Sequence, residues 1–197
     1  MSRSNAALAP LPSALDPGGS HEIDTDKARL DLAMIHGFLV RSHWAAGIPF
    51  AVMKQAIDNS LAFGLYRGSR QIGFARVVTD HATFAYLADV FVVEAERGKG
   101  LGRFLVDTVL AHPELQGLRR WLLGTRDAQS LYRRCGFAEP PAPFSFLERL
   151  DGAVYRTVRR GRASPGSRRS SASPAAVSGF AETARGPRAA ARAAPTQ

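Results

Sequence analysis

A glycine-rich loop is the part of this sequence whose residue types and spacing are most typical of ligand binding. Residues 97–102 read Arg-Gly-Lys-Gly-Leu-Gly and lie between an apolar run and a segment of helical spacing. Glycines let the backbone approach a ligand closely, and the unpaired N–H groups at a helix start favour an anion. The loop is therefore a candidate anion site, although glycines that serve only a turn explain the same pattern.

Two common phosphate-binding motifs do not fit this loop. A P-loop needs four residues between its first glycine and Gly-Lys, and Ser or Thr after Gly-Lys, but Val93 and Gly100 occupy those two positions. The dinucleotide fingerprint G-x-G-x-x-G needs a third glycine at position 103 or 105, which are Arg103 and Leu105. A mononucleotide P-loop and a dinucleotide fold are both excluded on spacing.

Asp89 is the second candidate, because it interrupts an apolar run that extends from Tyr86 to Phe91. A buried carboxylate is costly unless it is paired, so its presence needs an explanation. It can be a general base, it can pair with an arginine of a neighbouring strand such as Arg76, or it can lie in a water-filled cleft that holds a cationic substrate. The ion pair explains the residue at least as well as the base does.

The tryptophan, histidine and cysteine side chains are the other candidates for site residues. Trp44 lies in a predicted loop, where it can cover an amine site or simply anchor the packing. His36 and His43 have no carboxylate partners at ligand spacing, so no metal site is expected. Cys135 is the only cysteine, which excludes an internal disulfide, and we expect it to be a small buried apolar side chain rather than a nucleophile.

The elements that must position these residues alternate between helical and extended patterns. The spacing predicts helices over 29–40, 49–59, 101–110 and 127–135, and strands over 61–66, 71–78, 83–93 and 120–123. Turns are expected at 67–70 and at Asp80 and His81. A last hairpin is also expected, in which strands 146–150 and 153–157 are joined by a turn at Asp151-Gly152. The order of these elements predicts an α/β fold whose mixed sheet is antiparallel first and gains a parallel strand after helix 101–110.

The charge is concentrated at one end of the chain. The 197 residues carry a net charge of +9, which suggests nucleic acid as a partner. Residues 156–197, however, hold nine arginines and one glutamate, or +8, which leaves +1 for residues 1–155. We expect residues 1–20 and the Arg/Ala/Ser/Pro-rich tail 156–197 to be disordered, because neither can bury enough apolar surface, and residues 21–155 to form the folded domain.

No membrane or secretory segment is expected. The sequence has no run of about 18 apolar residues that could span a membrane. Pro10 and Pro12 interrupt the only apolar stretch that follows the basic Arg3, which argues against a signal peptide. A cytoplasmic location is therefore predicted.

Two motifs in order resemble the GCN5-related N-acetyltransferases (GNAT). Their acetyl-CoA loop, Gln/Arg-x-x-Gly-x-Gly/Ala, is matched by Arg97, Gly100 and Gly102, and their Leu-Tyr-x-x-x-Gly-Phe signature is matched by residues 131–137. The resemblance covers about residues 21–155, and Ser42-His43-Trp44 is similar to a Ser-x-Trp element of small bacterial members whose substrates are mostly unassigned. The family often has Asn seven residues before the tyrosine, where this chain has Thr125.

The resemblance implies a mainly antiparallel sheet that is splayed at its centre, with helices on both faces. It also implies acetyl-CoA as cosubstrate without a metal, and direct acetyl transfer to a primary amine of a small molecule or peptide. A backbone N–H at Val92 or Val93 would stabilise the oxyanion, and Tyr132 would protonate the leaving thiolate, whereas periodicity alone makes Tyr132 a core residue. The implied cofactor contacts are Val92, Val93, Arg97, Gly98, Lys99, Gly100, Leu101, Gly102 and Thr125.

Other functions remain open at this level. A non-catalytic acyl-CoA sensor uses the same loop, and a tail rich in arginine would bind nucleic acid in a salt-sensitive, sequence-blind way at most. The sequence sets neither the acceptor nor the general base, and both a monomer and a homodimer are compatible with it.

Overall fold

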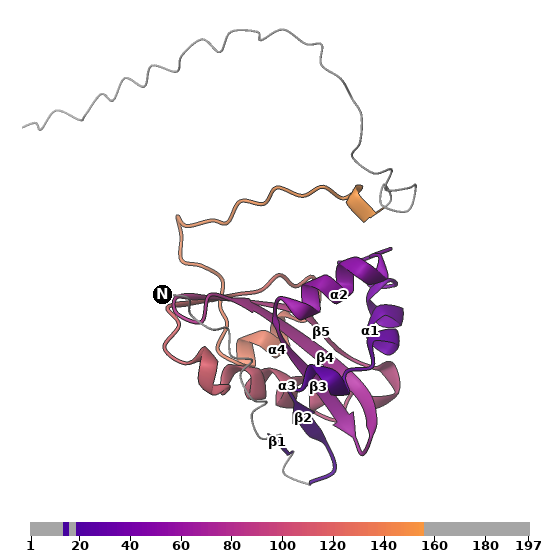
Figure 1. The fold of residues 1–197 in the computed structure, drawn as a ribbon. Helices are drawn as coiled ribbons and strands as arrows, with labels where there is room; N and C mark the ends of the chain where they lie inside the picture. Colours follow the sequence, from indigo (N-terminus) through magenta and orange to yellow (C-terminus); the bar gives the residue numbers. More distant parts are fainter. Residues whose placement is uncertain (1–13, 16–18, 156–197) are drawn as a thin grey trace, which may run out of the picture. The chain divides into compact units, whose positions relative to one another are not determined.

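The computed structural model describes residues 14–15 and 19–155, and these form a six-stranded sheet with helices packed on it (Figure 1). The predictions made for residues 1–13, 16–18 and 156–197 lie outside the described residues. The strands are β1 (Ala14–Leu15), β2 (Glu22–Asp24), β3 (Leu61–Arg67), β4 (Arg70–Thr79), β5 (Phe84–Val92) and β6 (Arg120–Leu122). The helices are α1 (Leu32–Leu39), α2 (Phe50–Asp58), α3 (Leu101–Leu110) and α4 (Gln129–Arg134), with short 3₁₀ turns at Lys27–Arg29, Glu94–Glu96 and Pro113–Leu115.

The sheet order follows the chain order, and only the last pair of strands is parallel. Strands β1 to β5 are antiparallel neighbours, and β6 adds beside β5 in parallel after α3. This arrangement confirms the predicted mixed, mainly antiparallel class. The strand β1 belongs to the segment 1–20 for which composition predicts disorder, and it pairs with β2.

The pairing of β5 with β6 is short, and this creates the splay at the centre of the sheet. It covers only Phe84 to Tyr86 on β5, opposite residues 120–122. Beyond Tyr86, β5 has no strand on that side within the described part of the chain. The backbone of residues 87–92 therefore forms a free edge in the middle of the fold.

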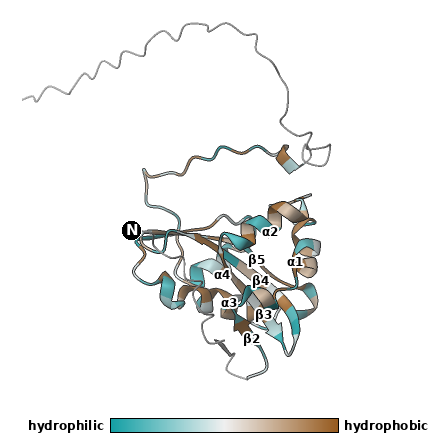
Figure 2. Cartoon of the chain, viewed as in Figure 1, coloured by the Kyte–Doolittle hydropathy of each residue, from teal (hydrophilic) through white to brown (hydrophobic). Residues whose placement is uncertain are grey.

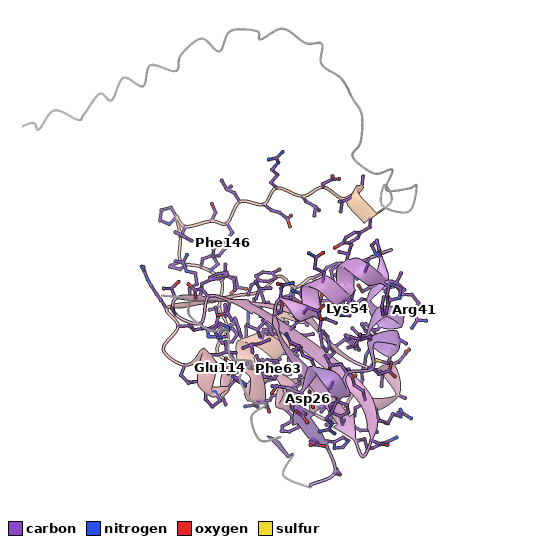
Figure 3. The ribbon with its side chains drawn as sticks, in the orientation of Figure 1. Asp26, Arg41, Lys54, Phe63, Glu114 and Phe146 are labelled. Carbon is purple, nitrogen blue, oxygen red and sulfur yellow. The ribbon has the colours of Figure 1, made fainter. Side chains whose placement is uncertain are left out.

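Helices cover both faces of the sheet (Figure 1). On one face, α3 and α4 pack over a cluster that includes Phe63, Leu65 and Leu105, and Phe63 is labelled in Figure 3. On the other face, α1 and α2 pack over Phe74 and Phe91. Figure 2 shows the hydrophobic segments of the sheet and of the helices that pack on it. The two apolar clusters hold the splayed edge between them.

An extra residue in β5 changes which side chains face each cluster. Two residue steps on β4, from Phe74 to Arg76, lie opposite three steps on β5, from Phe91 to Ala88. The bulge contains Asp89, which adopts a positive φ of 55°, a conformation that non-glycine residues rarely take. An inserted residue in a strand shifts the two-residue alternation, so side chains before and after Asp89 face opposite sides relative to the regular pattern.

Two of the predicted elements are wrong in part. The helix predicted over 29–40 begins only at Leu32, because the Asp31 side chain accepts the Met34 N–H and caps it there. The hairpin predicted for 146–157 is absent, since residues 146–155 include no strand. The Asp151 side chain accepts the Ala153 N–H instead, which starts a helical turn where the β-turn was expected.

The remaining elements match the predictions within about two residues. The turn at Asp80 has a clear local cause, because its carboxylate accepts the N–H groups of Ala82, Thr83 and Phe84 and the Thr83 hydroxyl. These hydrogen bonds, led by the one from the Thr83 hydroxyl, hold the pKa of Asp80 well below its ordinary value. The turn thus directs the chain back into β5.

Gly73 offers a test of how tightly β4 packs beside the bulge. A Cβ at Gly73 would lie 2.8 Å from the Phe91 carbonyl oxygen, so Gly73→Ala is expected to destabilise the fold by about 1–3 kcal/mol. Gly37 in α1 is the matched control, because nothing lies within 4 Å of its added Cβ. Gly37→Ala should stabilise by up to about 1 kcal/mol through helix propensity. Urea unfolding of both variants measures the difference, and equal effects would contradict the packing.

Candidate functional site

A cleft of about 1440 Å³ lies along the free edge of β5 and reaches both faces of the molecule's central region. We divide its lining into two halves. The anion half comprises the lining residues that fall within 92–102 and 124–132. The aromatic half comprises lining residues of 38–56, Arg76, residues 86–91, and Glu148, Leu150 and Tyr155. Every site residue predicted from the sequence lines this cleft except Lys99.

The glycine-rich loop forms a set of unused backbone donors at the start of α3. Gly98 and Gly100 both have φ of 79°, where an L side chain is strained. The N–H groups of Arg103 and Phe104 donate to the Gly100 carbonyl, but those of residues 98–102 have no acceptor among the described residues. Unpaired N–H groups at the positive end of a ten-residue helix are suited to an anion.

The end of β5 presents one free backbone N–H to the cleft. The Val93 N–H donates to the Ile72 carbonyl at 2.8 Å, so it is already used by β4. Bonding residues alternate along an antiparallel ladder, so the N–H and C=O of Val92 point away from β4 toward the free edge. Arg97 Nε donates to the Val92 carbonyl at 3.1 Å, which joins the glycine-rich loop to this edge. Of the two predicted oxyanion donors, only Val92 has its N–H available.

Glu96 is a site residue that sequence reasoning missed. Its side chain is only 2% exposed, and it pairs with Arg67 at 2.8 Å, Lys99 at 2.6 Å and Arg70 at 3.6 Å. The hydrogen bond from Lys99 is the main reason that the pKa of Glu96 lies below its ordinary value. Lys99 is therefore directed toward Glu96, which explains why it does not line the cleft. Nothing in the sequence distinguishes Glu96 from the exposed Glu94 two residues earlier.

Tyr132 and Thr125 contribute to the anion half from either side of the start of α4. The Tyr132 ring packs against the apolar cluster beneath α3 that includes Leu105. It lies edge-on to the Phe137 ring, with the two ring centroids 6.0 Å apart. Burial raises its pKa above the ordinary 10.0, and its hydroxyl has no partner among the described residues. The Thr125 hydroxyl accepts the Ala128 N–H at 3.1 Å and so orders the turn into α4. Burial also raises the pKa of Cys135, which keeps its thiol protonated.

Asp89, Arg76 and Trp44 form one hydrogen-bonded group in the aromatic half. Arg76 Nε donates to Asp89 Oδ2 at 2.8 Å, and both side chains are mostly buried. The ion pair that the sequence suggested is therefore present. Trp44 Nε1 donates to Asp89 Oδ1 at 3.2 Å, while its ring stays 46% exposed and lies near Phe38 and His43.

Two observations on the described residues concern metal ligands and helix length. They contain no group of three or more His, Cys, Asp or Glu side chains that could hold a metal ion. His36 Nε2 instead forms a hydrogen bond with the Ile48 carbonyl at 2.9 Å, and this bond links α1 to the loop before α2. Within the same residues, no helix has the length and apolar composition needed to cross a bilayer.

Comparison with known proteins identifies the family. Residues 58–139 match the family model described as acetyltransferase (GNAT) domain. A Gibberella zeae protein named as an acetyltransferase is 31% identical over 137 residues, which are 58% of this chain and 76% of that protein. The crystal structure of a Xanthomonas campestris pv. campestris protein assigned to the GNAT acetyltransferases is 48% identical, with a TM-score of 0.66, and covers 68% of this chain and 96% of that one. The chain belongs to the GNAT family.

A third likeness concerns the fold alone. A Deinococcus radiodurans protein described as an acetyltransferase aligns with a TM-score of 0.54 at 23% identity, over 66% of this chain and 89% of that one.

Membership of the GNAT family implies use of acetyl-CoA as the acetyl donor. The anion half suits that group chemically, because its unpaired N–H donors and the Arg97 side chain are the kind of groups that bind a pyrophosphate.

Replacing Glu96 should loosen the glycine-rich loop of this GNAT domain. Glu96→Gln removes the charge that holds Arg67, Arg70 and Lys99 together, so we expect a lower Tm and a several-fold higher Kd for acetyl-CoA. Asp107→Asn is the control, since its exposed pair with Arg103 should contribute little. Calorimetric titration measures both variants, and unchanged affinity in Glu96→Gln would contradict the role of Glu96.

The same carboxylate predicts a pH dependence. A lowered folded-state pKa stabilises the protein at pH values above the ordinary 4.5, and this stabilisation is lost as the pH falls through the lowered value. The difference in Tm between the native protein and Glu96→Gln should therefore be large at pH 7 and shrink in acid. A difference that is constant from pH 7 to pH 3 would argue against an ionic role.

Proposed function

We propose that this GNAT protein transfers the acetyl group of acetyl-CoA directly to a primary amine of a small molecule or peptide, with no acyl-enzyme. The observation that carries the proposal is one cleft in which three kinds of unused hydrogen-bond donor lie along a free sheet edge. They are the N–H groups of residues 98–102, the Val92 N–H and the Tyr132 hydroxyl. In the proposed reaction, the N–H groups of residues 98–102 bind an anion, the Val92 N–H stabilises the developing oxyanion, and the Tyr132 hydroxyl protonates the leaving group.

Binding of the donor depends on the anion half of the cleft. The N–H groups of residues 98–102 and the first turn of α3 would hold the pyrophosphate, with the exposed guanidinium of Arg97 beside them. The free edge of β5 offers unpaired backbone groups to the amide-containing arm of the ligand. When bound, acetyl-CoA supplies the thioester whose acetyl group is transferred.

The Val92 N–H is the proposed oxyanion donor. As the amine attacks, negative charge develops on the carbonyl oxygen, and a fixed N–H stabilises it without reorganisation. The bond from Arg97 Nε to the Val92 carbonyl fixes the following peptide unit and so restrains Val92, the residue that carries the donor N–H. The loop that binds the pyrophosphate is thereby connected to the group that stabilises the oxyanion.

Tyr132 is the proposed acid toward the leaving sulfur. Its raised pKa keeps the hydroxyl protonated at neutral pH, and the hydroxyl has no competing partner among the described residues. It can therefore donate to the sulfur as negative charge develops there. The C–N bond forms as the C–S bond breaks, the sulfur takes the proton of Tyr132, and the proton lost by the amine nitrogen returns through solvent to the Tyr132 oxygen, so the products are the amide and free coenzyme A thiol.

Asp89 is the proposed group that receives the amine. Both carboxylate oxygens already accept a hydrogen bond, from Trp44 and from Arg76. Each oxygen has a second lone pair, so Asp89 can still accept a hydrogen bond from the acceptor amine, directly or through one water. Trp44 is then the proposed substrate contact beside it.

Tyr132→Phe is the decisive variant for acetyl transfer. We expect kcat to fall about 100-fold, because general acid catalysis typically contributes that much or more, while the Kd for acetyl-CoA changes little. The measurements are release of free thiol with an amine panel and calorimetric titration. If the protein binds acetyl-CoA but neither it nor the variant acetylates any amine, it is an acyl-CoA binder rather than an enzyme.

The raised pKa of Tyr132 adds a pH prediction. The acid form is the protonated one, so kcat should show no loss from Tyr132 in the neutral and mildly alkaline range, because its pKa lies above the ordinary value of a tyrosine. A descending limb of kcat near pH 8 that is absent from Tyr132→Phe would contradict this assignment. The limb of kcat/KM on the acid side reports deprotonation of the free amine and shifts with the amine used.

A further inference from the structure

We infer that the acceptor is a singly charged amine carried on an aromatic or similarly flat apolar group, which packs against Trp44 in the aromatic half of the cleft. The inference rests on the proposed acetyl transfer and specifies its acceptor. Three observations carry it: the exposed Trp44 ring at Asp89 together with other aromatic rings in the same cleft, balanced charge, and internal hydrogen bonds of Ser42 and Arg76.

The exposed ring of Trp44 contacts the carboxylate that receives the amine, and other aromatic rings line the same cleft. Trp44 is 46% exposed and Tyr86 is 40% exposed, on different elements that both line the cleft, and Tyr155 lies on the same lining. Phe38 stacks on Phe91, with ring centroids 3.8 Å apart and ring planes 7° apart. The Phe38 ring also lies next to Trp44, so the surface around Trp44 is aromatic too. A flat apolar substituent would bury these rings and gain aromatic contacts.

Trp44 is held in place by the same carboxylate. Its indole N–H donates to Asp89 Oδ1, which fixes the ring beside the atoms that the amine must approach. An amine bound at Asp89 therefore carries its substituent against the indole. A protonated amine near the ring gains a further cation–π attraction before it loses its proton.

The charge in this half argues against a polycationic acceptor. Its charged lining residues are Arg41, Arg76, Asp89 and Glu148, two of each sign, and Arg41 is labelled beside α1 in Figure 3. Arg76 already neutralises Asp89. A polyamine would bring several ammonium groups, and each one that lost water without meeting a carboxylate would carry a desolvation cost. One positive charge is the most that the half accommodates without such a cost.

The polar groups argue against a sugar amine. Ser42 Oγ donates to the Leu39 carbonyl and accepts the Ala45 N–H, and Arg76 Nη1 donates to Ser60 Oγ. These groups keep their partners inside the protein. A polyhydroxylated acceptor would exchange its hydrogen bonds to water for few hydrogen bonds to the cleft, which is unfavourable.

The test compares amines of different chemistry with one enzyme preparation and acetyl-CoA. The probes are 2-phenylethylamine and tryptamine as aromatic monoamines, propylamine as the small reference, spermidine as the polyamine and glucosamine as the sugar. We expect kcat/KM for the aromatic amines to exceed that for the other three at least tenfold. Spermidine or glucosamine as the better acceptor would overturn the inference and leave acetyl transfer standing.

Variants of Trp44 separate ring contact from folding. Trp44→Ala removes both the ring and the hydrogen bond to Asp89, so we expect KM to rise for both amines, but about tenfold more for tryptamine than for propylamine. Trp44→Phe restores a ring without the N–H and should recover most of that difference between the two amines. Phe146→Ala is the matched control, because Phe146 is 48% exposed, lies outside the cleft lining and is labelled in Figure 3. A loss of equal size with both amines in Trp44→Ala would contradict the specificity role.

A binding measurement keeps the inference distinct from the proposed catalysis. Tryptamine is titrated into the full chain saturated with coenzyme A, which requires no turnover. Binding that weakens in Trp44→Ala supports the acceptor class even if no amine is acetylated, in which case only the proposed function fails. Absence of tryptamine binding in the native protein overturns the inference directly.

Discussion

The interrupted pairing of β5 is the constraint on which the rest of the site depends. β6 joins β5 over three residues only, and the bulge at Asp89 breaks the regular alternation just beyond them. A sheet edge normally lies at the outside of a fold, where water satisfies it. Here the edge lies between two apolar clusters, and its unused N–H and C=O groups face a cleft. The fold thus retains unpaired backbone groups where a ligand can use them.

Two carboxylates, the buried Glu96 and the mostly buried Asp89, connect this edge to its surroundings. Asp89 joins β5 to β4 and to the loop after α1, through Arg76 and Trp44. Glu96 joins the glycine-rich loop to the β3–β4 hairpin, through Arg67 and Arg70. Each acid is compensated by cations, which is the condition for burying a charge. The carboxylates therefore position the two halves of the cleft, and the proposed ligand contacts are backbone N–H groups, a hydroxyl, aromatic rings and Asp89 itself.

Most of the fold was predictable from local pattern, and the failures have local causes. The helix over 101–110 and the strand over 83–93 are long and strongly periodic, so their identity does not depend on distant contacts. The last hairpin failed because Asp151 can cap a helical turn as well as a β-turn, and sequence does not rank the two. The start of α1 was predicted too early because the regular apolar spacing also includes residues that precede the Asp31 cap.

By itself, the sequence determined the glycine-rich loop, the tyrosine seven residues after Thr125, and the order of the elements that carry them, because these are set by residue type and short-range spacing. Only the tertiary structure decided which backbone N–H is free, since Val92 and Val93 differ only in their alternation along the ladder with β4. It also decided that Asp89 pairs with Arg76 and Trp44, and that Glu96 rather than Glu94 is buried. These outcomes depend on contacts between segments distant in the chain, such as Trp44 and Asp89, which local spacing does not specify.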